Sequence, residues 1–99
     1  GMMVTEIAHI VIKAGQEADF EKSVAQAKPY FLAANGCHGV KLARCIEHPE
    51  QYQLFVQWET VEHHMVEFRE SENFQKWREL ASPHFEGAPR VEHIEDVDI

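Results

Sequence analysis

A histidine stands where the pattern around it calls for an apolar residue. In the segment after Thr60, apolar side chains recur at the i, i+4 and i+7 positions of an amphipathic helix, at Val61, Met65 and Phe68, and His64 takes the i+3 position on the same inward stripe. Imidazole is the side chain best able to exchange a proton near neutral pH. His64 is therefore a candidate acid or base. The alternative is a purely structural role, in which the His64 ring hydrogen-bonds a backbone carbonyl.

An arginine occupies a comparable place in the next helical segment. Arg78 lies on, or at the margin of, an inward stripe formed by Phe74, Trp77 and Ala81. A guanidinium group without a partner is costly in an apolar site, because the charge loses its hydration. Arg78 should therefore pair with a carboxylate such as Glu59, receive an anionic group of a ligand, or extend to the surface along its aliphatic stem.

A tryptophan adds an indole to the same region. Trp58 shares one strand face with Tyr52, Leu54 and Val56, and a helix should cover this face. An ordinary core residue would also suit this position. One apolar space would then be lined by an indole, an imidazole and a guanidinium. We therefore expect Trp58, His64 and Arg78 to be the catalytic residues. Apolar and aromatic neighbours are expected to bind the substrate: Tyr52, Leu54, Met65, Phe68, Phe74 and Trp77.

The periodicity of the chain predicts the elements that position these side chains. Residues of β-branched and alternating character predict strands over 4–13, 37–47, 52–58 and 90–98, and helical spacing predicts helices over 16–34, 61–69 and 73–81. The order β-α-β-β-α-β, with the second helix in two pieces, predicts an α+β fold with a ferredoxin-like protomer and an antiparallel sheet. A single domain over residues 2–99 would contain all of these elements.

Four residues should mark the ends of the helices. Pro29 should kink or break the last turns of the first helix. Gly36 suits the left-handed position that follows a helix. Thr60 and Ser71 are side chains that cap helix N-termini, so they should begin the two pieces of the second helix.

Apolar residues on both faces of the strands predict that a second layer of protein covers the sheet face opposite the helices. Ile10, Ile12 and Phe55 are expected on the face that the helices leave open. Two such sheets packed face to face in a homodimer would bury them. The last strand, over 90–98, is more polar than the others and is expected at an edge of the sheet or in a strand shared with the partner.

Charge and composition exclude several classes of protein. The chain has 9 basic and 17 acidic residues, a net charge of −8, and no basic cluster, so neither nucleic acid nor an anionic membrane is an expected partner. No apolar run approaches the ~20 residues of a membrane span, and we expect a cytoplasmic protein. Cys37 and Cys45 would be about 26 Å apart on one strand and should be free thiols. The seven histidines show no metal-ligand spacing, so no metal is expected.

A series of motifs in a fixed order resembles one known family. The run Leu54-Phe55-Val56-Gln57-Trp58-Glu59 is followed by His63-His64, by Phe68-Arg69-x-Ser71-x-x-Phe74-x-x-Trp77-Arg78, by Pro83-x-Phe85 and by Val91-Glu92-His93. This order resembles the antibiotic biosynthesis monooxygenase domain over nearly the whole chain. The resemblance implies a ferredoxin-like protomer and a homodimer whose sheets form an α/β barrel.

The same resemblance implies a reaction and a set of site residues. Characterised members of the family oxidise polyphenols such as anthrones to quinones with O₂ and without metal, flavin or haem, so no cofactor is expected. The family's strand tryptophan matches Trp58 and its helical arginine matches Arg78. A tyrosine of the family falls on His64, and an asparagine falls on Leu54. The residues that haem-degrading relatives need fall near Ala8, Phe68 and Arg78 and are missing.

Three functions follow as hypotheses. The first is a cofactor-independent monooxygenase acting on a small aromatic phenol or hydroquinone, in which His64 accepts a proton, Arg78 stabilises the anion and Trp58 stacks on the ring. The second is a non-catalytic dimeric module that binds a small hydrophobic acid. The third is an isomerase or degrader of a small signalling metabolite, which would form product without consuming O₂.

Overall fold

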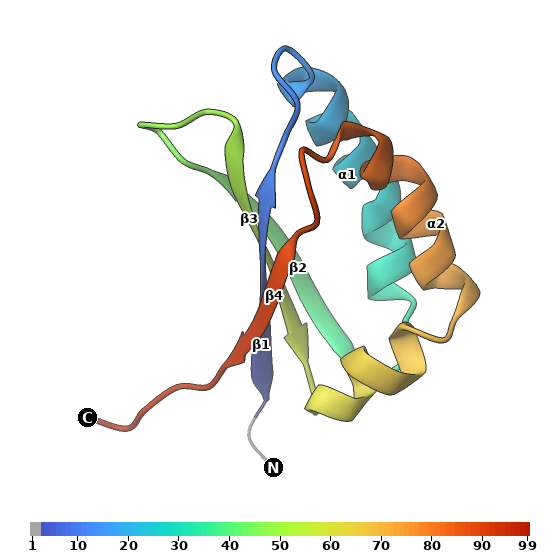
Figure 1. The fold of residues 1–99 in the computed structure, drawn as a ribbon. Helices are drawn as coiled ribbons and strands as arrows, with labels where there is room; N and C mark the ends of the chain where they lie inside the picture. Colours follow the sequence, from blue (N-terminus) through green and yellow to red (C-terminus); the bar gives the residue numbers. More distant parts are fainter. Residues whose placement is uncertain (1–2) are drawn as a thin grey trace.

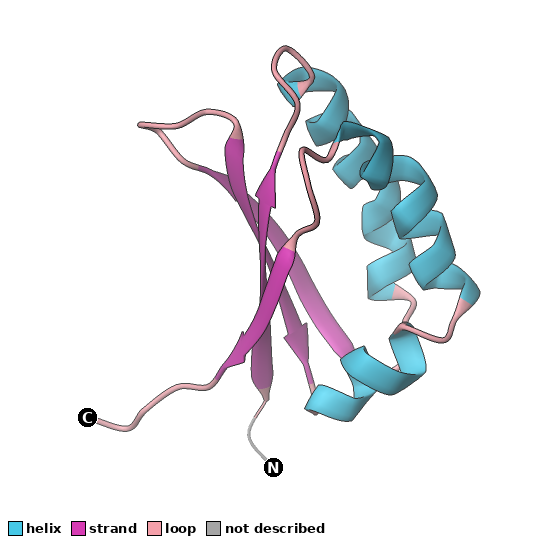
Figure 2. Cartoon of the chain, viewed as in Figure 1, coloured by secondary structure: helices cyan, strands magenta, loops and turns pink. Residues whose placement is uncertain are grey.

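The fold is a four-stranded antiparallel sheet with all helices on one face (Figures 1 and 2). The computed structural model describes residues 3–99, so Met2, where the expected domain begins, lies outside the described residues. The strands are β1 (Val4–Val11), β2 (Cys37–Arg44), β3 (Gln51–Trp58) and β4 (Arg90–Ile94), in the order β2-β3-β1-β4. This arrangement confirms the α+β ferredoxin-like fold and places β4 at an edge.

The helical layer has two long helices and two short ones. Helix α1 (Glu17–Leu32) packs beside α2 (Glu72–Ala81), the π-helix η1 (His63–Phe68) precedes α2, and the 3₁₀ turn η2 (Ser82–His84) follows it. The prediction of a second helix in two pieces is therefore confirmed. The expectation that Pro29 would break α1 is wrong, because the helix continues to Leu32 and the Ala33 amide donates to the Pro29 carbonyl.

The predicted N-caps Thr60 and Ser71 act at the start of helical segments, but Gly36 is not the cap of α1, which ends at Leu32 with Ala33 as its C-cap. The Thr60 hydroxyl accepts from the His63 amide at 3.2 Å, and the Ser71 hydroxyl accepts from the Phe74 amide at 3.3 Å. Each supplies an acceptor for an amide that has no partner inside its helix. Gly36 has φ +80°, and a Cβ there would lie 2.5 Å from the His63 ring, so glycine permits both the backbone angle and the close packing.

The core lies between the sheet and the helices, and it corrects one prediction. Ile10 and Ile12 are 1% and 2% exposed on the helix-covered face, with Ala8 and Glu6 beside them. The expectation that Ile10 and Ile12 lie on the open face is therefore wrong. Because side chains alternate along a strand, the residues of β1 on the open face are those of opposite parity, such as Ile7 and His9.

Two further expectations have definite outcomes. Cys37 and Cys45 are free, as predicted. Strand β4 ends at Ile94, four residues before the predicted end, and residues 95–99 form no strand or helix. Within residues 3–99, no helix has both the length and the apolar character needed to cross a bilayer.

Candidate functional site

A cavity of about 560 Å³ lies between the sheet and the helices. Its polar lining consists mainly of four ionisable side chains: Glu6, His64, Arg69 and Arg78. Phe68, Phe74 and Trp77 supply aromatic walls. A mostly apolar cavity of this size with a few converging polar groups is typical of a small-molecule site.

One of the two buried polar side chains of the cavity is Glu6. Glu6 is 4% exposed and comes from β1, where it lies opposite Val56 of β3 and opposite His93 of β4. The Trp58 indole N–H donates to Glu6 Oε1 at 2.9 Å, and His64 Nε2 lies 3.2 Å from the same oxygen. The sheet register therefore brings the end of β3 and the edge strand β4 to one carboxylate.

The contacts continue from His64 toward the surface. His64 Nδ1 lies 2.8 Å from Nε2 of the half-buried His93, and the His64 ring stacks on Trp58 with ring centroids 5.4 Å apart and planes 14° from parallel. Glu6, Trp58, His64 and His93 thus form one connected set, here named the buried polar chain. Trp58 supplies Glu6 with a hydrogen-bond donor, and the His64 ring packs beside the same carboxylate oxygen.

Burial determines the protonation states of Glu6 and His64 in the buried polar chain. Burial raises the pKa of Glu6 from 4.5 to about 7, although the Trp58 hydrogen bond and the Arg69 charge oppose this rise. Burial, together with the charges of His93 and Arg69, lowers the pKa of His64 from 6.5 to about 3. His64 is therefore neutral at physiological pH. Neutral His64 contacts Glu6 Oε1 through Nε2 and shares a hydrogen bond with His93 Nε2 through Nδ1.

The two arginines of the cavity occupy different depths. Arg78 is exposed and lies at the rim, whereas Arg69 is half-buried and its Nε is buried without a hydrogen-bond partner among residues 3–99. The Arg69 guanidinium lies 5.6 Å from the centroid of the Phe74 ring. The arginine that enters the apolar space is therefore Arg69, which the helical spacing did not indicate.

The π-helix explains why Arg69 faces the cavity. In an α-helix, a residue five positions after His64 points about 140° away from it. In η1 the Arg69 amide instead donates to the His64 carbonyl at 3.1 Å, which is an i→i+5 bond. Such a turn contains more residues than an α-turn, so the fifth residue returns toward the side of the first. Both His64 and Arg69 then line the same cavity.

The structure brings together some of the predicted site residues. His64 and Arg78 line the cavity, as do three of the predicted substrate-binding residues, Phe68, Phe74 and Trp77. Trp58 is fully buried behind His64, and its N–H is bound to Glu6. Arg78 does not pair with Glu59, whose carboxylate instead binds His38 at 2.9 Å.

The remaining predicted residues lie elsewhere. Leu54 is buried in the core and Met65 is 40% exposed, and neither lines this cavity. The Tyr52 hydroxyl donates to Glu21 at 2.6 Å, beside a smaller cavity of about 290 Å³ at the other end of the sheet. Burial and the Glu21 contact raise the pKa of Tyr52 to about 12, so it stays protonated.

Two functional candidates, Glu6 and Arg69, were missed from the sequence, and one had a usable signal. Glu6 shares the parity of Ala8, Ile10 and Ile12, so it is a carboxylate on an apolar strand face. Assigning Ile10 and Ile12 to the open face concealed it. Nothing in the spacing of residues 61–69 indicates the π-helix that turns Arg69 inward.

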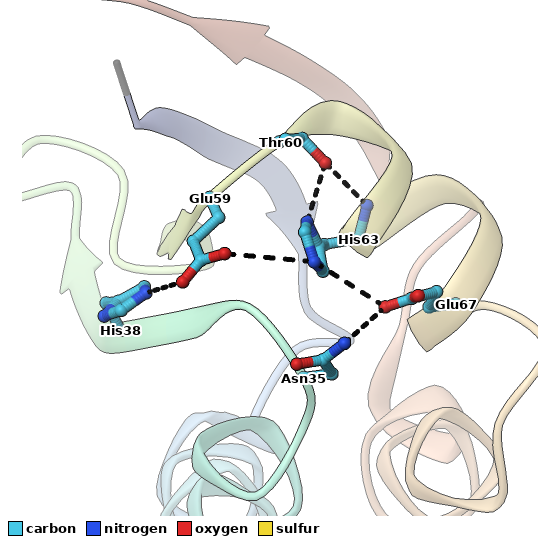
Figure 3. A network of polar contacts seen from close by, with 6 residues as sticks. All are labelled: Asn35, His38, Glu59, Thr60, His63 and Glu67. Carbon is cyan, nitrogen blue, oxygen red and sulfur yellow. Dashed lines mark hydrogen bonds and ion pairs between the residues drawn. The ribbon is translucent and has the colours of Figure 1, made fainter. Parts of the chain in front are cut away.

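A second set of polar residues lies on the surface close to the first. Figure 3 shows His63 between Glu59 and Glu67, with Nε2 at 4.0 and 3.8 Å from their carboxylate oxygens, while its Nδ1 lies 2.7 Å from the Thr60 hydroxyl. These residues form the surface network: Asn35, His38, Glu59, Thr60, His63 and Glu67. Across residues 3–99, no group of three or more histidine, cysteine or acidic side chains is arranged to hold a metal ion.

Comparison with known proteins identifies the family of the chain. A family model described as antibiotic biosynthesis monooxygenase matches residues 3–80. The chain belongs to the antibiotic biosynthesis monooxygenase family. The matched residues contain β1, η1 and most of α2, and therefore the four ionisable side chains of the cavity; the partner of His64 in β4 lies beyond them.

Individual members of the family resemble the chain to different degrees. The crystal structure of a candidate antibiotic biosynthesis monooxygenase from Bordetella bronchiseptica is 52% identical, with a TM-score of 0.96 over 98% of this chain and 99% of that one. The uncharacterized protein YczJ of Bacillus subtilis strain 168 is 39% identical over 96% of this chain and 100% of its own length. A family protein from Nitrosomonas europaea shares the fold, with a TM-score of 0.84, at 12% identity over 98% of this chain and 92% of that one.

Proposed function

We propose that this chain is a cofactor-independent monooxygenase that oxidises a small phenol- or hydroquinone-type aromatic substrate with O₂. The observation that carries the proposal is Glu6, a buried carboxyl at the wall of the cavity with a pKa of about 7. A base with a pKa near the working pH combines a large ionised fraction with a strong tendency to accept a proton. Membership of the monooxygenase family supports the reaction class.

The first step is removal of the phenolic proton by ionised Glu6. The Trp58 indole holds the carboxylate in place by donating to Oε1, and the His64 ring packs beside the same oxygen. Neutral His64 is thus a positioning residue, and Glu6 takes the role of base that the helical spacing suggested for His64. The phenolate lies between aromatic walls, where Arg78 at the rim stabilises the negative charge.

The phenolate then reacts with O₂ without an added reductant. It gives one electron to O₂, and the resulting phenoxyl radical and superoxide couple through a new C–O bond at a ring carbon that bears hydrogen. Protonated Glu6 returns its proton to the peroxide. Ionised Glu6 next removes the hydrogen of that carbon as a proton, the O–O bond breaks, and a carbonyl forms. The hydroxide that leaves takes this proton, so phenol and O₂ give quinone and one water.

The test is O₂ consumption together with quinone absorbance for a panel of anthrones and hydroquinones. Glu6→Gln keeps the size and the hydrogen-bond acceptor but cannot accept the proton, so the rate should fall by ~10²- to 10⁴-fold. Glu59→Gln is the matched control in the surface network and should keep the rate. Equal rates for the wild type and Glu6→Gln would remove Glu6 from the mechanism. Ligand binding with no O₂ uptake would favour the binding module.

We also propose that the chain is a homodimer joined through the open face of the sheet. The helices cover only one face (Figure 2), and the other carries half-buried Ile7 and Phe55 together with Val11 and Ile94, which are 41% and 46% exposed. Apolar side chains gathered on one flat face are typical of an interface. Sedimentation at micromolar concentration should show a dimer, and Ile7→Glu should give monomers. Val66→Glu, on the exposed side of η1, is the control and should remain dimeric.

A further inference from the structure

The arginines of this chain fall into two pairs. Arg44 binds Glu21 at 2.6 Å and Arg90 binds Glu92 at 3.1 Å, both in exposed positions. Neither Arg69 nor Arg78 has a carboxylate oxygen of residues 3–99 within 4.0 Å, and both line the cavity. In a chain with 17 acidic residues, the guanidinium groups left without an ion pair are those of the cavity.

The unpaired state of Arg69 is the more informative of the two. An exposed arginine such as Arg78 is hydrated, but the Arg69 Nε is buried and has no acceptor within residues 3–99. The Phe74 ring beneath the guanidinium favours its position without supplying an acceptor. A buried N–H without a partner is costly. An oxygen ligand in the cavity would satisfy it, and an anionic oxygen would satisfy the charge as well.

The net charge of the side chains around the cavity indicates which ligand charge the cavity favours. With Glu6 ionised and with neutral His64, the two arginines leave a net charge of +1. A ligand with a single negative charge gives neutrality, whereas a dianion would add repulsion toward Glu6. The planar guanidinium fork matches a carboxylate, and the aromatic walls match a flat ring.

We propose that the cavity binds an aromatic carboxylic acid, whose carboxylate pairs with Arg69 while its ring lies between the aromatic walls and faces Glu6. This inference rests on the proposed function only for the reaction: it adds that the phenolic substrate carries a carboxylate. Arg78 at the rim reinforces the field, and Arg69 makes the direct contact. Neutral analogues of the same shape therefore bind more weakly.

The test compares two redox-inert probes of the same shape, the anion 2-naphthoate and the neutral 2-naphthamide. Titration calorimetry at pH 8 should show that the wild type binds the acid about 10- to 100-fold more tightly than the amide, which is the usual contribution of a charged hydrogen bond. Arg69→Gln should abolish this preference, and Arg78→Gln should reduce it less. Arg44→Gln, which removes an ion-paired surface arginine, should leave it unchanged.

A second variant distinguishes loss of ligand binding from loss of folding. Arg69→Lys keeps the positive charge but lacks the planar fork and the Nε donor, so it should retain part of the preference. Thermal unfolding of each variant shows that the folded protein is being titrated. The inference is overturned if the wild type binds acid and amide equally, if it binds no acid at millimolar concentration, or if folded Arg69→Gln keeps the full preference.

The outcomes also separate this inference from the proposed function. Selective binding of naphthoate without O₂ uptake on any phenol would keep the acid site and remove the monooxygenase. O₂ uptake at equal kcat/KM for matched neutral and carboxylated phenols would keep the monooxygenase and remove the acid site.

Discussion

Two adjacent histidines of η1 have opposite environments. His64 is 2% exposed and joins the buried polar chain, whereas the side chain of His63 is 21% exposed and lies between two carboxylates of the surface network (Figure 3). The first contacts a buried carboxyl whose pKa is raised to about 7, and the second contacts exposed carboxylates. Burial, and not residue type or spacing, therefore decides which histidine–glutamate contact is suited to proton transfer.

The largest expected difference between the buried polar chain and the surface network is in their contribution to the free energy of unfolding. His64→Ala should lower the free energy of unfolding by about 3 to 5 kcal/mol, because it opens a cavity beside Trp58 and removes the hydrogen bond with His93. His63→Ala should change it by less than about 1 kcal/mol, since exposed ion pairs contribute little. Urea denaturation of both variants gives the comparison. Similar losses would show that the buried polar chain is not the more important of the two.

The second difference is the direction in which pH changes stability. The pKa of Glu6 is about 7 in the folded chain and 4.5 in the unfolded one, so its contribution is fully present below pH 4.5 and is lost as pH rises to 7. Glu6→Gln should therefore gain roughly 3 kcal/mol relative to the wild type between these pH values. Denaturation at several pH values measures this change.

Glu59 provides a control of opposite sign for that experiment. Its hydrogen bond with His38 lowers the pKa of Glu59, so its contribution is present above the unfolded pKa and is lost as pH falls through the lowered value. Glu59→Gln should therefore lose stability relative to the wild type as pH rises toward 4.5. The same sign for both variants would contradict the assigned pKa shifts.

The third difference concerns the rate. A base with a pKa of about 7 must lose its proton before it acts, so kcat/KM should fall about tenfold per pH unit below 7 and be ~100-fold lower at pH 5 than on the plateau. Initial rates across pH 5 to 9 provide the profile. Glu59→Gln should reproduce the wild-type curve, and a rate independent of pH would exclude Glu6 as the base.

The smallest expected effect lies at the start of η1. Thr60→Ala removes the acceptor of the His63 amide and the contact with His63 Nδ1, and should destabilise the chain by about 1 kcal/mol. Thr60→Ser keeps the hydroxyl and should be close to the wild type. Thermal unfolding resolves the two. A larger loss from Thr60→Ala than from His64→Ala would reverse the ranking of the two sets.

The sequence predicts the fold more completely than it predicts the site. Alternation, helical spacing and the caps at Thr60 and Ser71 are local signals, and they correctly predict the order of elements. Which face of a strand is covered depends on packing between strands, and an apolar run such as Ile10-Val11-Ile12 presents apolar residues to both faces. The wrong choice there placed two core residues on the open face and concealed Glu6.

The site also depends on a backbone geometry that spacing arguments omit. Helical wheels assume 3.6 residues per turn, and on that assumption Arg69 points away from His64 while Arg78 points inward. The wider turn of η1 brings Arg69 into the cavity, and Arg78 lies at the rim. Of the three predicted catalytic residues, His64 and Arg78 line the cavity and Trp58 contacts it only through Glu6 and His64.

The π-helix also bears on how the sequences of relatives align in this segment. A relative with one residue fewer between the histidine and the arginine would form an ordinary α-turn, in which the arginine follows the histidine by four positions. Residues four positions apart lie on the same side of an α-helix, so the arginine of that relative would still face the cavity. A one-residue gap here therefore preserves the cavity arginine, whereas a one-residue insertion without a π-turn would turn it away.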